Sequence, residues 1–113
     1  MDEAVEKIAA LGVPGLVLIG VMSSTGLAGA AAFTSALAIL GGPFGMFAGV
    51  ATMGVLILIS QTIAKFGAEK VGEAVVNELK AKGKTNAEIL YEINKFPISK
   101  DLKLKLRYLV LSQ

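Results

Sequence analysis

The sequence predicts an all-α protein, built as a transmembrane helical hairpin followed by short amphipathic helices. The first observation is residues 8–64, 57 positions without one Asp, Glu, Lys, Arg or His. A soluble domain of 113 residues rarely hides so much uncharged chain, because its helices place charges on the face that meets water. The second is that Gly and Pro divide this stretch into helix-length pieces. The third is that charge returns directly after it, with ten Lys/Arg and six acids in residues 65–113.

A short helix is expected over residues 2–11, before the apolar stretch. Asp2 is its predicted N-cap, and one face of the helix comprises Val5, Ile8 and Ala9. The segment Gly12-Val13-Pro14 ends it, because a proline disfavours helical geometry in the preceding residue and suits the first turn of a new helix. We therefore expect an N-terminal amphipathic unit at residues 1–12 and a Gly/Ala-rich membrane hairpin at residues 13–66.

The first limb of the hairpin is too long for one upright helix. Residues 14–40 would extend about 40 Å as a straight helix, against about 30 Å of hydrocarbon. The run Ser23-Ser24-Thr25-Gly26 is a natural bend within it. Two arrangements remain open. Either one tilted or kinked helix spans the bilayer, or residues 14–22 form a short re-entrant or interfacial piece and residues 26–40 span separately.

The second limb fits a bilayer more closely. Gly41-Gly42-Pro43 predicts a tight turn, and residues 43–64 would then form about 33 Å of helix, close to the hydrocarbon thickness. An uncharged turn can cross the membrane, so both ends of the hairpin lie on one side. The lysines that begin at Lys65 indicate that this side is cytoplasmic. We expect an integral membrane protein with both termini in the cytoplasm.

Small residues form two stripes in the hairpin, where they would let helix backbones approach closely. The stripe on the second limb is Gly41, Gly45, Gly49 and Thr52. The stripe on the first limb is Ala28, Ala31, Ser35 and Ala38. The two stripes can close the hairpin on itself, or one of them can remain for other copies of the chain. The second alternative predicts a homo-oligomer.

Charged amphipathic helices are expected in residues 67–113. Residues 66–82 are predicted to continue the second limb as one helix, with an apolar side made of Ala68, Val71, Val75 and Leu79. Gly83 ends this helix. The segment Thr85-Asn86-Ala87-Glu88 has the capping-box pattern, so a helix should begin there and run to residue 94 with inward residues Ile89, Leu90 and Ile93.

A last helix is predicted after the break at Phe96-Pro97. Ser99 is its expected N-cap, and the helix should extend to about residue 111. Its apolar stripe is Leu102, Leu106, Leu109 and Val110.

The basic residues of this last helix have three interpretations. They are Lys100, Lys103, Lys105 and Arg107. They can form the solvated face of a small helical unit, or they can rest on anionic lipid with Tyr108 at the interface. The third interpretation, a DNA-recognition helix, fits poorly because the preceding turn contains Phe-Pro and the helices are short. We therefore expect lipid as a partner, a possible protein partner for residues 67–113, and no nucleic acid.

Catalytic chemistry has little support in this composition. The chain has no Cys and no His, which removes thiolate chemistry and the commonest acid/base and metal ligand near neutral pH. Ser23, Ser24, Ser35 and Ser60 have no base nearby in the sequence, so we expect their hydroxyls to bond neighbouring carbonyls. Gly41-Gly42-Pro43 lacks the Lys-Ser/Thr of a phosphate-binding loop. The prediction is a protein that is not an enzyme, with no metal and no cofactor.

Residues 26–54 resemble the interferon-alpha-inducible 6/27-like family of small hydrophobic membrane proteins. The similarity lies in uncharged Gly/Ala/Ser helices, a Gly-Gly turn at residues 41–42 and the Ala-rich segment 48–52 that follows it. It extends over about residues 13–66, whereas the charged tail 69–113 departs from the family's pattern. The resemblance implies a membrane protein linked to immunity or cell death that acts on membrane integrity, and it implies no catalytic residue.

The hypothesis that follows is an oligomer that perturbs or permeabilises a membrane. The main alternative is a membrane-anchored adaptor, in which the hairpin only anchors and the C-terminal helices recruit a partner. Another alternative is a soluble oligomeric assembly that buries the hairpin among subunits.

Overall fold

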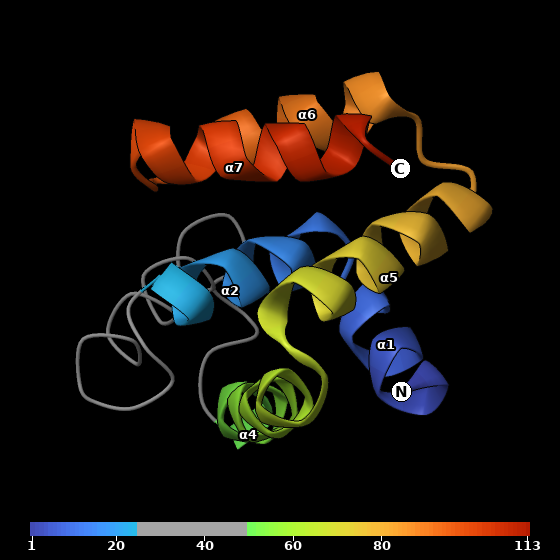
Figure 1. The fold of residues 1–113 in the computed structure, drawn as a ribbon, viewed down its shortest axis with the longest axis vertical. Helices are drawn as coiled ribbons and strands as arrows, with labels where there is room; N and C mark the ends of the chain where they lie inside the picture. Colours follow the sequence, from blue (N-terminus) through green and yellow to red (C-terminus); the bar gives the residue numbers. More distant parts are fainter. Residues whose placement is uncertain (25–49) are drawn as a thin grey trace.

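The computed structural model describes residues 1–24 and 50–113, and for residues 50–53 and 55 it describes the backbone alone. These residues form six helices and no strand: α1 (Asp2–Ala9), α2 (Val13–Ser24), α4 (Val50–Phe66), α5 (Ala68–Ala81), α6 (Asn86–Asn94) and α7 (Lys100–Leu111) (Figure 1). The prediction of an all-α protein is confirmed for this part of the chain.

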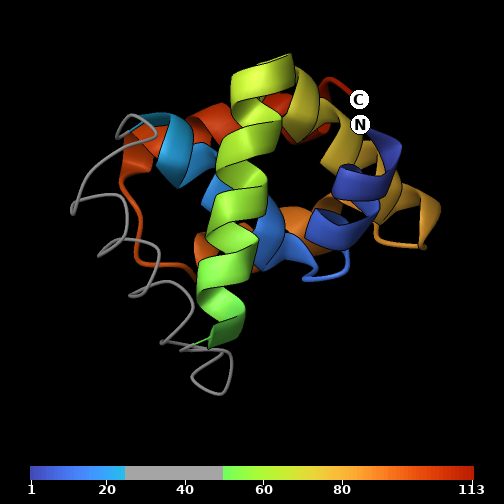
Figure 2. The same ribbon diagram turned by 90° about the horizontal axis from the view of Figure 1, so that it is seen from below.

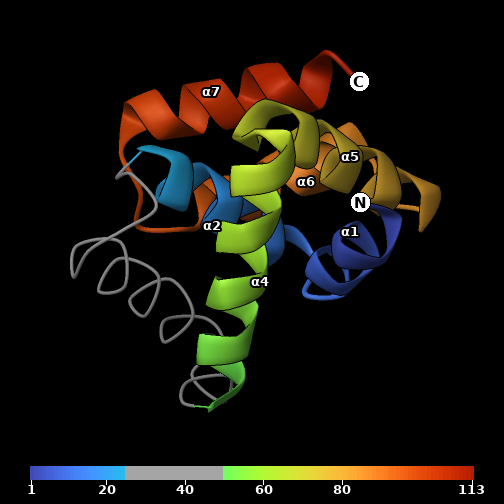
Figure 3. The same cartoon turned by 60° about the horizontal axis from the view of Figure 1, so that its bottom comes forward.

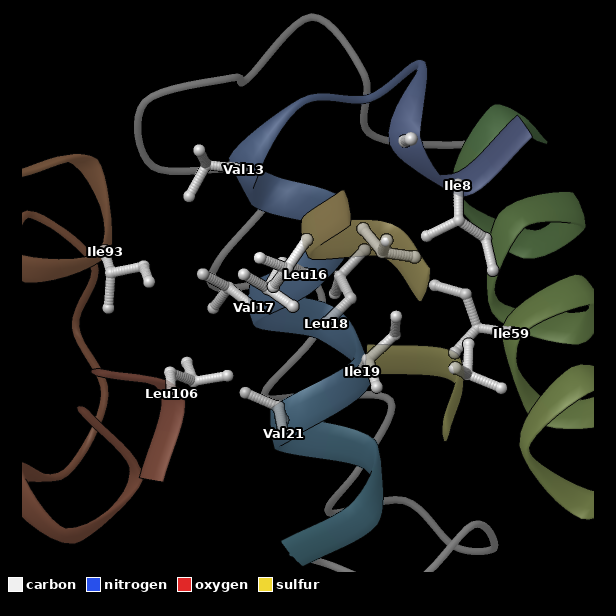
Figure 4. Close-up of a cluster of buried hydrophobic side chains, with 14 of the residues drawn as sticks. Ile8, Val13, Leu16, Val17, Leu18, Ile19, Val21, Ile59, Ile93 and Leu106 are labelled. Atoms are coloured by element: carbon white, nitrogen blue, oxygen red, sulfur yellow. The ribbon is translucent and has the colours of Figure 1, made fainter. Parts of the chain in front are cut away.

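Helix α2 lies at the centre, and each of the other five described helices contacts it. Every residue from 13 to 22 is buried. Figure 4 shows side chains of α2 pointing in several directions, with Ile8 and Ile59 on one side and Ile93 and Leu106 on the other. A helix covered by protein on all sides needs no charged face, which accounts for the uncharged sequence of residues 13–22 without lipid.

The remaining helices lie on two sides of α2. Figure 1 shows α6 and α7, which contact each other, above it and α4 below it, and Figure 3 shows α7 above it and α4 extending below it. Helix α4 packs on α1, α2 and α5. Figures 2 and 3 show the N-terminal half of α4 extending beyond the other described helices.

The α1–α2 corner is close to the predicted one. Val5, Ile8 and Ala9 are buried as expected. The prediction of Asp2 as N-cap is wrong: Met1 occupies the cap position, no side chain accepts a capping hydrogen bond, and the helix ends at Ala9. The chain then turns at Gly12, whose φ of 78° favours glycine, and α2 starts at an angle of 112° to α1.

Residues 68–81 are helical, close to the predicted 66–82, but the prediction that this helix continues the second limb without a break is wrong. Gly67, with φ 91° and ψ 143°, separates α4 from α5. The break lets α5 take its own direction and bury its apolar side against the core, where Val71, Val75, Val76 and Leu79 have almost no exposed surface. The apolar pattern typical of a helix continues on both sides of Gly67, so the sequence did not predict a break at this single glycine.

Local capping chemistry sets the ends of the C-terminal helices as predicted. Gly83, with φ 101°, follows α5. Thr85 Oγ1 accepts a hydrogen bond from the Glu88 backbone N–H at 3.2 Å, and the Glu88 carboxylate accepts one from the Thr85 N–H at 3.2 Å. Ser99 Oγ accepts from the Leu102 N–H at 3.2 Å. These are the predicted capping box of α6 and the predicted cap of α7.

A lysine of α5 donates hydrogen bonds to main-chain oxygens at the C-terminal end of α7. Lys80 Nζ donates to the carbonyl oxygens of Val110 at 3.0 Å and Gln113 at 2.8 Å. The last carbonyls of a helix lack partners within the helix and carry partial negative charge, so a lysine there stabilises them. The buried residues of α6 and α7 are Ile89, Ile93, Leu102, Leu106 and Val110, while Leu90 and Leu109 are half-buried at the edge of the core.

Within the described residues, no helix taken alone has both the length and the apolar content to cross a bilayer. Helices α1 and α2 satisfy both conditions only as a pair, across their 112° bend.

Candidate interaction surfaces

The predicted small-residue stripes lie almost entirely outside the described residues. This applies to Ala28, Ala31, Ser35, Ala38, Gly41, Gly45 and Gly49. Thr52 lies in the first turn of α4, where only the backbone is described. The packing roles of these residues therefore stay predictions.

Helix α4 buries one face in the core. Its opposite face is exposed and carries no charged side chain between Gly54 and Ala64. Leu56, Ile59 and Ile63 are buried, and the hydroxyl of buried Thr62 donates to the Leu58 carbonyl at 2.7 Å, so that side needs no polar partner from elsewhere. The outer face of α4 comprises Gly54, Ile57, Gln61 and Ala64, which are all exposed. Ile57 is 53% exposed.

The outer faces of the other peripheral helices differ from this one. Helix α1 exposes Asp2, Glu3, Glu6 and Lys7, and α7 exposes a cation or an acid in nearly every turn. On α4 the first charge after Gly54 is Lys65, at the end of the helix. The outer face of α4 carries no charge of its own from Gly54 to Ala64, although Gln61 lines a hollow with Glu3, Lys7 and Lys65, so we treat this face as a candidate interaction surface.

The structure separates the four basic residues predicted as a single surface. Lys100, Lys103 and Arg107 line a cleft of about 500 Å³ between α6 and α7. Lys105 lies on the other flank of α7, at a hollow of about 380 Å³ that it shares with Glu69 and Glu73 of α5. Contact of any of these residues with lipid stays a prediction.

The α6–α7 cleft combines cations with apolar side chains. Besides the three cations, its lining consists of Ala87, Leu90, Tyr91, Ile93, Asn94 and Leu104. Tyr91 is 65% and Leu104 is 63% exposed. Lys103 Nζ donates to the Asn94 carbonyl at 3.0 Å, which ties α7 to the end of α6, and Lys95 Nζ lies 4.3 Å from the Tyr91 ring centroid.

Tyr91 and Leu104 were not expected from the sequence to form a site. Leu104 stands among lysines on the polar side of its helix, four residues after Lys100. An apolar residue on a charged face was the one available signal, and only the packing of α6 against α7 shows that Tyr91 lies across from it.

The hydroxyl groups of α2 behave as predicted. Ser23 Oγ donates to the Gly20 carbonyl at 3.0 Å and Ser24 Oγ to the Val21 carbonyl at 3.1 Å, both within their own helix. Of the acids in residues 1–24 and 50–113, no three lie close enough together to hold a metal ion.

The geometry therefore offers two candidate interaction surfaces, the outer face of α4 and the α6–α7 cleft. Comparison of the chain with protein-family models, with curated proteins and with solved structures gives no match.

Proposed function

We propose that this protein acts in a membrane, where copies associate through uncharged helices and perturb or permeabilise the bilayer. The observation that carries the proposal is the outer face of α4. It is exposed in the single chain, it contains no charge from Gly54 to Ala64, and it presents Ile57 to the surroundings. Lipid or another copy of the chain supplies the apolar environment that such a face fits.

The position of α4 supports the same proposal. Its N-terminal half projects from the other described helices, so the outer face can meet a bilayer without unfolding the core around α2 (Figure 3). The cations that begin at Lys65 lie just beyond the apolar part, where they would stay at the cytoplasmic membrane surface. In this proposal α4 lies at the membrane while α2 stays in the protein core, and the resemblance of residues 26–54 links the protein to immunity or cell death.

Dye leakage from anionic liposomes tests the proposal. Purified protein should release small dyes and retain large ones, because an oligomeric pore has a limited bore. The chain lacks cysteine, so a single Ile57→Cys variant can carry an environment-sensitive fluorophore. Its emission should shift to the blue on addition of liposomes, while the same fluorophore at Ser112→Cys serves as the control on the opposite side of α2.

The other outcomes separate the alternatives. Membrane partition without leakage would reject permeabilisation and leave a membrane-anchored adaptor, which the α6–α7 cleft favours. A discrete particle in detergent-free buffer that ignores liposomes would reject the membrane altogether. It would indicate a soluble assembly of several subunits. The outer face of α4 would then be buried between subunits, whereas α2 is buried within a single subunit.

A further inference from the structure

We propose that the α6–α7 cleft is a docking site for an acidic amphipathic helix of a partner protein. The inference goes beyond the membrane function, since it concerns the side of the molecule away from α4 (Figure 1).

Apolar side chains are concentrated on this side. Of the six large hydrophobic residues that the described part of the chain exposes, four lie on α6 and α7: Tyr91, Leu104, Tyr108 and Leu111. Tyr91 and Leu104 belong to the cleft, whereas Tyr108 lies at the hollow on the other flank of α7 and Leu111 lines neither. Exposed apolar residues that gather in one place and have polar neighbours mark binding sites more often than scattered ones do.

The charge of the cleft selects an acidic occupant. Its lining includes Lys100, Lys103 and Arg107 and no carboxylate. The two acids of α6 are engaged elsewhere, Glu88 in the capping box and Glu92 in a 2.7 Å ion pair with Lys84. In the described residues Lys100 and Arg107 have no ion-pair partner. Complementary charge on a partner would lie opposite these two side chains.

The shape of the cleft selects a helix rather than a lipid surface. It runs between helices of nine and twelve residues, about 14 and 18 Å long. A third helix can lie along such a groove and insert apolar anchors spaced three or four residues apart. A bilayer surface is flat on this scale and would leave the concave space of about 500 Å³ unfilled.

The protein's own acidic helices do not suit the cleft. Helices α1 and α5 each carry three acids, but the apolar residues of both, such as Ile8 and Val75, are already buried in the core. A second copy would have to release α1 or α5 from its fold to supply an apolar face. The occupant that fits is therefore a different protein.

Selection from a displayed library of helices tests the proposal with the full-length protein in nanodiscs or detergent. The library would hold amphipathic helices of about twelve residues, randomised on both faces. We expect enrichment of Leu, Ile or Phe at spacings of three and four, and of Glu or Asp beside them. The affinity of an enriched peptide is then measured by fluorescence anisotropy against matched variants.

Two pairs of variants test whether the peptide binds at the α6–α7 cleft. Arg107→Glu should weaken binding about tenfold or more, whereas Lys105→Glu, the same charge change on the other flank of α7, should change it less than about threefold. Leu104→Ser should weaken binding, whereas Leu111→Ser, an exposed leucine outside the cleft lining, should not. All four positions are exposed, so the fold should tolerate each change.

Three results would overturn the proposal. The first is a selection that enriches no acidic amphipathic sequence. The second is a peptide that binds all four variants equally. The third is binding of the protein to anionic vesicles that Arg107→Glu and Lys105→Glu weaken alike, together with no peptide binding, which would assign the surface to lipid. Leakage from liposomes is measured separately, so the membrane function can fail or hold independently of this site.

Discussion

Helix α2 and all but the last two residues of α4 lie within the uncharged residues 8–64, yet the two helices are buried to different extents. Every residue of α2 from 13 to 22 is buried among five other helices. Helix α4 buries only one side and presents Gly54, Ile57, Gln61 and Ala64 on the other. The lack of charge therefore has two physical causes. In α2 it is explained by burial within the chain, whereas for α4 the proposed function supplies lipid or another copy of the chain.

The largest effect should come from a charge placed in α2. Leu18 has no exposed surface, so Leu18→Lys would bury an unpaired ammonium group at a cost of several kcal/mol and should abolish the cooperative unfolding transition. Leu104→Lys, the same change at an exposed position, should leave the free energy of unfolding within about 0.5 kcal/mol. Urea unfolding followed by circular dichroism measures both. Equal stability of the two variants would show that α2 is not the core.

A charge on the outer face of α4 should instead affect membrane partition. Ile57→Lys should leave the unfolding free energy nearly unchanged, but it would cost up to about 2.5–3.5 kcal/mol if residue 57 reaches the bilayer centre. Vesicle flotation measures the partition. Tyr108→Lys, another exposed apolar residue on the other side of α2, is the control. If Tyr108→Lys has the larger effect, the lipid contact belongs to α7.

Alanine at two glycines should change stability in opposite directions. A Cβ at Gly15 would meet the backbone carbonyl oxygen of Ile8, so Gly15→Ala should lower the free energy of unfolding by about 1–3 kcal/mol. A Cβ at Gly54 would meet nothing within 4 Å, and Gly54→Ala should raise it by about 0.5–1 kcal/mol. Thermal unfolding of the two variants provides the comparison, and changes of the same sign would contradict it.

The smallest change in the free energy of unfolding should come from destabilising α6, one of the helices that cover α2. Thr85→Ala removes the capping box of α6 and should cost about 1 kcal/mol. Helix α6 contacts α2, so amide hydrogen exchange should become faster in α6 and α2 and stay the same in the first half of α4. Ser112→Ala, which removes two exposed hydroxyl bonds, one donated to the Leu109 carbonyl and one accepted from Gln113 Nε2, is the control. Faster exchange in α4 alone would refute the separation of the two helices.

The helix ends of the C-terminal region could be predicted because they depend on neighbours in sequence. Thr85 with Glu88, Ser99 with Leu102, and Gly83 act within three or four residues, so their chemistry is visible in the chain itself. The helix break at Gly67 accompanies the packing of α5 against α2, which is a tertiary contact. The residues next to Gly67 in the sequence therefore do not predict the break. The burial of α2 was missed for a related reason, since an apolar sequence suits protein and lipid surroundings equally.

The candidate sites follow the same division. Lys100, Lys103 and Arg107 could be selected from the sequence, because charge and helical spacing are local properties. Their separation from Lys105, and the cleft that they share with Tyr91 and Leu104, depend on how α6 and α7 lie against each other. The predicted glycine and alanine stripes of residues 28–49 fall outside the described residues, so their test depends on experiments on self-association.

Gly67 also has a mechanical consequence. A continuous helix from residue 50 to residue 81 would be a rod of about 48 Å, and any tilt of its apolar end would act as a lever on the buried side of α5. The left-handed glycine divides the rod into two arms. Torque on α4, from a bilayer or from a neighbouring subunit, would then reach α5 through one backbone position and through the packed side of α4, and not along a rigid rod. Replacing Gly67 with an L-residue would stiffen this joint as well as strain it.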